Sequence, residues 1–548
     1  PPSASNAVLS ISVAGGASPG IDHMWVTVTG FAMHADASQV YGNGDAGWVT
    51  QPLDQPVTLD LASATLSQGQ SQSLLRQTVT ALGSYAQLRL IVASSDANAS
   101  LKASATAAGL VYNDQVQYTD AGGVHVVPLE IPDPQAGIRL LSPFSLSGDA
   151  TTPLSIEWNA HASLVRRASP TGVDRFALRD ELVLYNQQLL TALGDGNLQI
   201  DGSVFDSISG QLDTTQFCTG ASHVGCIHDV IASATSLSAD TRFHQEVRSV
   251  NVAASGSFVL YPLPTQTVYD VVIHGGNMQT LVVRGVFVDP TGLLKPFPTA
   301  LSSVATPIVP TLDTTEHAVT VTNALAPRGS RVFFGQTIGG SGGTIADLPY
   351  TIAYDAADPA TGAVLHAVTL PGGPLHDAVF DPKTQGLGTP PPFTTVTQKE
   401  GLGAWSVWSQ GTLADGTSSL TTLAAAAAGV VAPAPPRLAG FADGTLTLTL
   451  AGTPSNAADR AEAVVTDGGG TVAVVDISSL IAHGGATPIT VPTGSASGAS
   501  GAAGAARYGV AVHTWKTGSE LASSRWARQG APVDMTSATT ASVTLNLP

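Results

Sequence analysis

Short runs in which polar and apolar residues alternate recur along the whole of this 548-residue sequence. Residues 57–61, 445–450 and 543–547 are clear examples. Period-two alternation suits a half-buried β-strand, because successive side chains point to opposite faces of a sheet. The 57 Gly and 35 Pro residues interrupt these runs and leave little room for long helices. The pattern predicts an all-β fold of serial β-sandwich domains with few short helices. Residues 71–82 are the best helical window, and residues 180–193 fit either a strand or a helix.

The charge balance excludes several classes of partner. Only 11% of the residues are charged, and 22 basic residues are spread among 40 acidic ones, which gives a formal net charge of −18. A protein that binds phosphates needs clustered Lys and Arg, so we exclude nucleic acid and anionic membrane surfaces as partners. A surface with few charges suits β-proteins that pack against each other, since few charges lose their water at a contact.

The sequence predicts an exported protein. No stretch reaches the roughly 20 apolar residues that a membrane-spanning helix needs, so no membrane span is expected. No signal peptide is present, yet residue 1 is Pro rather than Met. A cleaved export signal is the simplest interpretation, and trimming of the chain by other means is the alternative. We expect an extracellular location, at a bacterial cell surface.

The two cysteines, Cys218 and Cys226, lie in one loop-like stretch with seven residues between them. In an exported protein we expect a local disulfide between them. His223 and His228 are close enough in sequence to complete a four-ligand metal site, but the spacing matches no zinc pattern. We therefore predict a disulfide and no metal.

Pro-rich and low-complexity segments divide the chain into four predicted domains. A connector with four prolines spans residues 291–310, and the stretch Ala-Pro-Ala-Pro-Pro at 432–436 should be extended and stiff. The predicted domains cover residues 7–190, 197–290, 311–430 and 437–548.

The first domain resembles the "domain of unknown function" family numbered 4382. The resemblance is carried by the order of its motifs, at residues 9–13, 21–30, 47–50, 57–61, 83–90, 156–160, 163–165 and 176–179. It implies an exported, often lipid-anchored, β-rich surface protein without known catalytic residues. A lipid anchor needs an N-terminal Cys, so either the anchor lies upstream of Pro1 or the protein is released.

The second domain resembles a carboxypeptidase-regulatory (transthyretin-like) β-sandwich, on the motifs at residues 208–212, 256–260, 263–264 and 269–273. The resemblance implies a spacer or adhesive module of bacterial surface proteins. The last two domains read as further Ig-like or transthyretin-like sandwiches.

Candidate chemical motifs have simpler structural explanations. Ser341 lies in a Gly-Gly-Ser-Gly-Gly stretch that fits the nucleophile-elbow pattern, but that elbow needs a strand before it and a helix after it. Residues 43–45 and 195–197 carry Asn-Gly and Asp-Gly pairs, which favour tight turns over calcium loops. Trp405 and Trp408 should lie on opposite faces of one strand, which favours core packing over sugar stacking. We predict no catalytic residues, no metal and no cofactor.

Both chain ends are strand-like, at residues 7–13 and 541–547. Each strand either belongs to its own terminal sandwich or pairs with the next subunit by strand addition. A contact that does not close on itself generates a helical filament. The candidate inter-subunit residues are Leu9, Ile11, Val13, Val543, Leu545 and Leu547.

These observations favour a non-enzymatic extracellular structural protein, a homopolymer that forms a surface filament or sheath through β-strand contacts. The alternative is a monomeric adhesin or carbohydrate-binding protein that recognises surface glycans, and it predicts an exposed aromatic patch at a sandwich tip. An exported hydrolase would need a Ser-His-Asp or paired-carboxylate cleft, which the spacing does not indicate.

Overall fold

The computed structural model confirms the all-β prediction: 56% of the described residues are in strands and 7% in helices. No helix among them is long and apolar enough to cross a membrane. The described residues are 6–37, 39, 41, 47–167, 173–179, 183–186, 205–217, 227, 229–238, 241–275, 277–288, 299–313, 320–322, 331–340, 342–361, 363–364, 370–385, 388–401, 403–412, 418–420, 424–427, 430–431, 442–467, 470–493 and 506–547.

The N-terminal domain packs two sheets around one core, which the alternating residues of the first strand help to fill. The first sheet has the order β12 (Val183–Asn186), β9 (Thr151–Glu157), β1 (Ala7–Ala14) and β4 (Ser71–Val79). The second sheet has the order β10 (Leu164–Arg167), β11 (Arg175–Leu178), β7 (Gly123–Glu130), β6 (Gln115–Asp120), β2 (His23–His34), β5 (Gly83–Val92) and β8 (Ile138–Leu146), with β3 (Val49–Asp60) on β2. Two short helices, α1 (Ala64–Ser67) and α2 (Ala103–Ala107), complete the domain.

The helical prediction for residues 71–82 is wrong, because this segment forms strand β4. β4 pairs antiparallel with β1, and its register shifts where Ile11 faces Leu75 and Ser12 faces Ser73. Leu74 is the extra residue at this bulge, and both Leu74 and Leu75 are buried. The bulge breaks the period-two pattern, so the strand does not look like one in the sequence.

The central body is built on one sheet of 11 strands. Its order is β25 (Thr394–Val396), β24 (Leu375–Val379), β18 (Met278–Val288), β17 (Thr267–Gly275), β14 (Ile231–Leu237), β15 (His244–Asn251), β22 (Tyr350–Ala356), β21 (Arg331–Gln336), β26 (Ala404–Thr412) and β27 (Ser418–Leu420), with β28 (Ala424–Ala427) on β26. Strands from the segments 197–290 and 311–430 therefore share a sheet, through the parallel pairs β15–β22 and β18–β24.

Two small sheets flank the large one. They are β16 (Ser257–Pro264), β13 (Phe205–Gln211) and β19 (Thr299–Ala300), and β23 (Ala363–Val364), β20 (Thr320–Thr322) and β29 (Val430–Val431). The short helices of this body are η1 (Thr214–Gln216), η2 (Ile345–Asp347) and α4 (Pro382–Gln385).

The C-terminal domain is a two-sheet sandwich with its own core. One sheet is β33 (Ala486–Thr493), β30 (Ala442–Ala451) and β37 (Thr540–Asn546). The other is β32 (Gly470–Asp476), β31 (Arg460–Asp467), β34 (Arg507–Trp515) and β35 (Arg525–Arg528), with β36 (Val533–Asp534) on β34. Helix α5 (Ser478–His483) packs Leu480 and Ile481 on this core, and helix α6 (Glu520–Ser523) places Leu521 against the N-terminal core.

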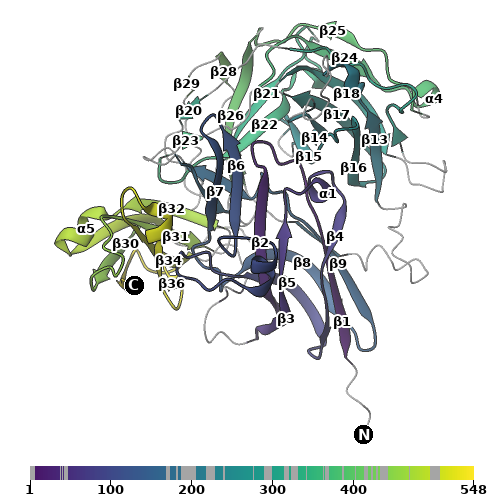
Figure 1. Ribbon diagram of the computed structural model, residues 1–548. Coiled ribbons are helices and arrows are strands. Elements are labelled where there is room, and N and C mark those ends of the chain that lie inside the picture. The colour runs from purple at the N-terminus through teal and green to yellow at the C-terminus, as the bar shows by residue number, and fades with distance from the viewer. Residues whose placement is uncertain are drawn as a thin grey trace.

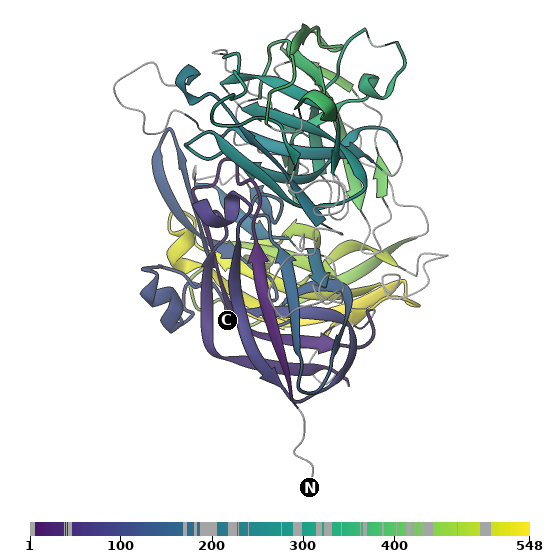
Figure 2. The same cartoon turned by 90° about the vertical axis from the view of Figure 1, so that its right-hand side faces the viewer.

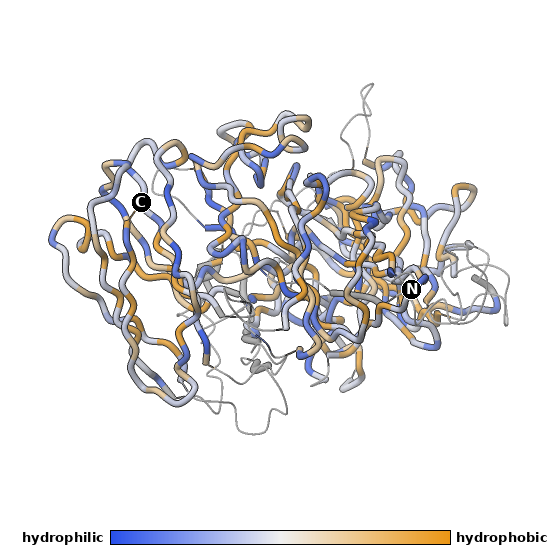
Figure 3. The backbone as a smooth tube through the Cα atoms, turned by 90° about the horizontal axis from the view of Figure 1, so that it is seen from below, coloured by the Kyte–Doolittle hydropathy of each residue, from blue (hydrophilic) through white to orange (hydrophobic). Residues whose placement is uncertain are grey.

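The central body, teal to green, lies above the N-terminal domain in Figure 1, and the yellow C-terminal domain lies beside the N-terminal domain. Figure 2 shows the same arrangement from the side, with the C-terminal domain again level with the N-terminal one. Apolar stretches are short and are spread over the whole chain in Figure 3. Trp405 and Trp408 are fully buried in two different core clusters, as their spacing predicts.

Candidate functional site

A buried cluster of charged residues lies where the three bodies meet. Its base is in the N-terminal domain, where β10 and β11 pair antiparallel and Arg167 lies directly opposite Arg175. Glu130, at the end of β7, is the neighbour of Ala177 on β11. Two like charges opposed across strands repel each other, so this arrangement requires carboxylates around it.

Three carboxylates from three parts of the chain surround the two guanidinium groups. Glu130 accepts from Arg175 Nε at 2.5 Å and from Arg167 Nη1 at 3.3 Å. Asp358, which follows β22 of the central body, lies 3.2 Å from Arg167 Nε. Glu462, on β31 of the C-terminal domain, accepts both Arg167 Nη1 at 3.1 Å and Nη2 at 3.2 Å. Arg175 Nη2 adds a bond of 2.6 Å to the same carboxylate.

The ions of this cluster are stabilised against the cost of burial. Glu462 is only 8% exposed. Burial opposes its charge, but Arg175 and Arg167 hold the pKa of Glu462 well below its usual range. Removing one partner from such a network leaves a buried charge without compensation, which is strongly destabilising.

An aromatic wall on the C-terminal side closes the cluster. His513 on β34 stacks on Trp526 of β35, with ring centroids 4.4 Å apart and planes 5° apart. Arg175 lies over the ring of Trp515, 4.8 Å from its centroid. Arg175 Nη2 also donates to His513 Nδ1 at 2.9 Å, and His513 Nε2 lies 2.7 Å from the Ser524 hydroxyl. His513 Nδ1 also lies 3.4 Å from Glu462 Oε1, so the ring contacts both the guanidinium and the carboxylate.

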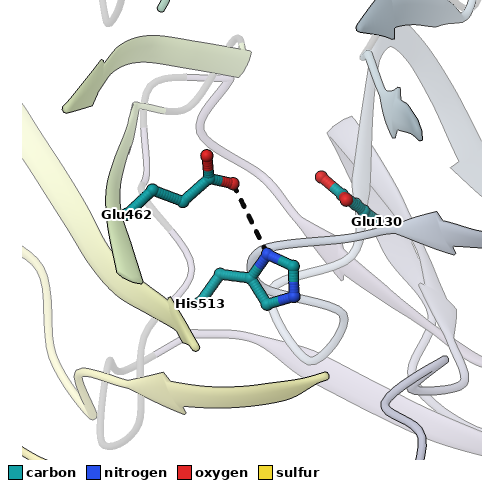
Figure 4. Close-up of side chains that lie close together, drawn as sticks. All are labelled: Glu130, Glu462 and His513. Carbon is teal, nitrogen blue, oxygen red and sulfur yellow. Dashed lines mark hydrogen bonds and ion pairs between the residues drawn. The ribbon is translucent and has the colours of Figure 1, made fainter. Parts of the chain in front are cut away.

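Glu130, Glu462 and His513 have the composition of a metal-binding group. Their ligand atoms lie within 4.8 Å of one another, and Figure 4 shows how Glu462 and His513 approach each other. However, Arg167 and Arg175 already bind the carboxylate oxygens, and a dication between them would meet two positive charges. We therefore interpret the cluster as an ion-pair network.

Further contacts hold the N-terminal domain to both neighbours. Arg528 of the C-terminal domain makes two bonds to the Asp96 carboxylate, at 2.9 and 3.1 Å, and donates to the Pro132 carbonyl at 2.5 Å. Arg248 of the central body pairs with Glu157 and donates to the Gly15 carbonyl at 2.6 Å. The three bodies are thus joined by charge-assisted bonds at several places.

A small cavity lies between the N-terminal domain and the central body, near His161, Glu246 and Tyr354. Burial lowers the pKa of His161, but the Asp355 carboxylate 3.1 Å away outweighs it, so the pKa is raised. Burial raises the pKa of Glu246. The cavity has a volume of about 30 Å³, which suits about two water molecules rather than a substrate.

The predicted inter-subunit residues lie in two different environments. Leu9, Ile11 and Val13 are fully buried on β1, which pairs with β4 on one side and β9 on the other. β1 therefore has no free edge here, although a strand donated by another copy would occupy the same place in the sheet. Strand exchange through β1 stays a prediction.

The C-terminal strand has an open edge. Val543 and Leu545 are buried in the C-terminal core, and Leu547 is half-buried against it. β37 pairs in parallel with β30, and among the described residues β30 is its one strand partner. The backbone groups on its other side are not used by a described strand.

Some predicted residues lie outside the described residues: Cys218, Cys226, His223, His228, Ser341, residues 43–45, residues 195–197 and the linker 432–436. No motif in the sequence marks the charged junction directly. Its signal is the Arg166-Arg167 pair in a strand-like segment of a chain with few charges. No local sequence pattern indicates that the carboxylates of Asp358 and Glu462, which come from distant segments, belong to the junction.

Comparisons with solved structures give only weak likenesses to bacterial surface proteins. The Bacillus anthracis TIE protein is 9% identical, with 98% of this chain and 74% of that chain covered and a TM-score of 0.14. A streptococcal ancillary pilin is 10% identical, with 63% and 99% covered and a TM-score of 0.12. Two B repeat units of the Staphylococcus aureus collagen-binding protein are 8% identical, with 99% of each chain covered and a TM-score of 0.12. TM-scores this low carry no argument about the present chain.

Comparisons of sequence are informative for the first domain. No curated protein matches the chain. The comparisons give no support for a carboxypeptidase-regulatory domain at residues 197–290, and that resemblance stays a prediction. The model of the family described as "Domain of unknown function (DUF4382)" matches residues 7–179, the segment that supplies Glu130, Arg167 and Arg175 to the junction. The N-terminal part of this chain, residues 7–179, is therefore a DUF4382 domain.

Proposed function

We propose that this chain is a non-enzymatic structural protein of the bacterial cell surface. Its subunits associate with each other through β-strand contacts and build a filament or a sheath outside the cell. The single observation that carries the self-association is the open edge of β37, an uncharged strand whose described strand partner is β30 alone. An unprotected edge strand presents a row of unused N–H and C=O groups, which is a template for pairing with another chain.

The charged junction supports a structural role. It joins the N-terminal domain, the central body and the C-terminal domain through buried ion pairs to Arg167. Bodies joined in this way keep their relative orientation, so an edge on the C-terminal domain has a fixed direction relative to the other two. A fixed direction is what a regular repeat in a polymer requires.

The surface gives less support to the adhesin alternative. Sugar-binding platforms use exposed aromatic rings, but the large hydrophobic side chains that are exposed among the described residues include no Trp and no Tyr. Trp158, Trp405, Trp408 and Trp526 are buried. Phe287 is exposed, and Trp25, Trp48 and Trp515 are half-buried. Among the described residues, no exposed Trp or Tyr therefore marks the patch that the alternative predicts.

Electron microscopy tests the proposal directly. Material sheared from the producing cells would be imaged in negative stain, and the purified full chain would be measured by light scattering. We expect uniform fibres with a regular repeat that contain this chain, and scattering masses above the 55.5 kDa of one chain. A monodisperse 55.5 kDa particle, with no fibres on the cells, would overturn the proposal in favour of a monomeric surface protein.

A further inference from the structure

We infer that β37 pairs antiparallel with β37 of a second copy, around a two-fold axis at Val543. This inference rests on the proposed self-association and names the strand, its direction and its register. It rests on the backbone direction of β37, on the chemistry of its open edge, and on the protection of other edges.

The hydrogen bonds of β37 fix which of its residues face outward. Leu547 N–H donates to the Ala451 carbonyl at 2.8 Å, and the Thr539 carbonyl accepts from Thr445 N–H at 2.9 Å. In a strand, the N–H and C=O of one residue point to the same side and those of the next residue point to the other. The odd-numbered residues of β37 therefore bond to β30. The outward backbone groups belong to Thr540, Ser542, Thr544 and Asn546, whose side chains are all exposed.

Among the residues that the structure describes, the outward edge carries none of the usual protections. Natural edge strands are blocked by charged residues, prolines, bulges or covering elements. Thr540–Asn546 contains no charged residue, no Pro and no Gly, and its pairing with β30 is regular over seven residues. Hydroxyl and amide side chains on this face add no charge repulsion when two copies approach.

The opposite edge of the same sheet is protected. β33 carries Pro488 and Pro492, two even-numbered residues whose backbone groups point to the same side of the strand. A proline in an edge strand is tolerated where its missing N–H would point to solvent. The edge of β4 in the N-terminal domain is also covered in part. Gln77 Nε2 donates to the Pro52 carbonyl of β3, and Gln51 Nε2 donates to the Thr78 carbonyl of β4. Of these three edges, β37 is the one that is open.

The register of a β37 pair follows from the outward direction of the even-numbered backbone groups. With the axis at Val543, Ser542 faces Thr544 of the second copy, and Thr540 faces Asn546 of the second copy. Outward residues then oppose outward residues, so each pair exchanges its N–H and C=O bonds. Val543 and Leu545 stay on the core face, and the pairing gives one continuous sheet with three strands from each copy.

This contact is self-complementary, and therefore it closes. The β37 pair makes a dimer as the building unit, and growth of a filament from that unit requires a second contact elsewhere. The dimer and the filament can for this reason be tested separately.

Charge placement on the edge tests the pairing and its direction. The double variant Ser542→Lys/Thr544→Lys places lysines opposite each other across the axis. We expect its dimer dissociation constant to rise about tenfold or more relative to the unmodified full chain, measured by sedimentation equilibrium. The matched variant Ser542→Lys/Thr544→Glu places Lys opposite Glu and should retain the dimer. Both side chains point to solvent, so neither variant disturbs the core.

A second measurement reports on the backbone. Amide hydrogen exchange of Thr540, Ser542, Thr544 and Asn546 should slow as the concentration of the full chain rises through the dimer range. Equal dimerisation of the Lys/Lys and Lys/Glu variants, or fast exchange of these amides in the dimer, would overturn the inference. If fibres from cells persist while the edge amides stay unprotected, the proposed function stands and the β37 pairing fails.

Discussion

Asp114 illustrates how a single residue makes the stability of this protein depend on pH. Its carboxylate is fully buried and accepts bonds from Thr27 N–H at 2.6 Å and from the Ser95 hydroxyl at 2.8 Å. Burial raises the pKa of Asp114 to about 7, and the two hydrogen bonds lower it only in part. An unfolded Asp has a pKa of about 3.9. Between roughly pH 4 and pH 7 the folded state therefore holds a proton that the unfolded state has released.

The sign of the effect follows from the proton balance. Because the folded state binds more protons in this window, the contribution of Asp114 to the free energy of unfolding falls as pH rises through it. The variant Asp114→Asn removes the titration. We expect its stability relative to the unmodified chain to improve from pH 4.5 to pH 7.5, by no more than about 1.4 kcal/mol per pH unit. Urea unfolding at both pH values measures the difference.

A control for this prediction is Asp459→Asn, because hydrogen bonds from Thr517 lower the pKa of Asp459 instead of raising it. Its difference from the unmodified chain should not improve as pH rises. A parallel response of the two Asn variants would show that Asp114 does not carry the effect.

At the scale of the element, close approach of strands decides which residues a position accepts. Gly335 lies on β21, between the neighbouring strands β22 and β26. A Cβ atom at this position would lie 2.8 Å from the Trp408 ring and 2.9 Å from the Tyr350 carbonyl oxygen. Trp408 also stacks on Phe333, so its ring has little freedom to move away.

We expect Gly335→Ala to lower the free energy of unfolding by about 1–3 kcal/mol, because it overpacks a filled core. Denaturant unfolding followed by Trp fluorescence measures the loss. Gly530→Ala is the matched control, since nothing lies within 4 Å of a Cβ atom there. Equal losses in the two variants would refute the steric explanation.

At the scale of the molecule, the charged junction determines how the C-terminal domain is held. The C-terminal domain supplies the Glu462 carboxylate to the junction, and this carboxylate binds both Arg167 and Arg175. The variant Glu462→Lys would place a third positive charge among these residues. Breaking a buried pair in this way costs about 3–5 kcal/mol, against about 0–1 kcal/mol for an exposed pair.

We expect Glu462→Lys to release the C-terminal domain and to increase the radius of gyration measured by small-angle X-ray scattering. Glu462→Gln, which keeps the shape of the side chain, should weaken the junction less. Asp534→Lys is the control, because Asp534 pairs with Arg507 at a site where both side chains are well exposed. Unchanged scattering from Glu462→Lys would mean that other contacts, such as that of Arg528 with Asp96, hold the domain alone.

The sequence alone predicted the fold class and several strands. β1, β30 and β37 each show period-two alternation, and alternate apolar residues of each strand are buried, such as Leu9, Leu446 and Val543. The sequence pattern of residues 71–82 does not indicate their strand, because a bulge at Leu74 removes the alternation locally. The strand β12 (Val183–Asn186) lies in the segment that fitted either structure.

What the sequence determined is local: alternation specifies strands because neighbouring side chains along one strand point to opposite faces. Which strands share a sheet, and which charges meet, was decided by the tertiary structure. Arg167 and Glu462 are 295 residues apart, and no local pattern relates them. They pair because the C-terminal domain packs against the N-terminal one, where a charge is stable only beside its partner. The open edge of β37 depends likewise on which strands the fold places beside it.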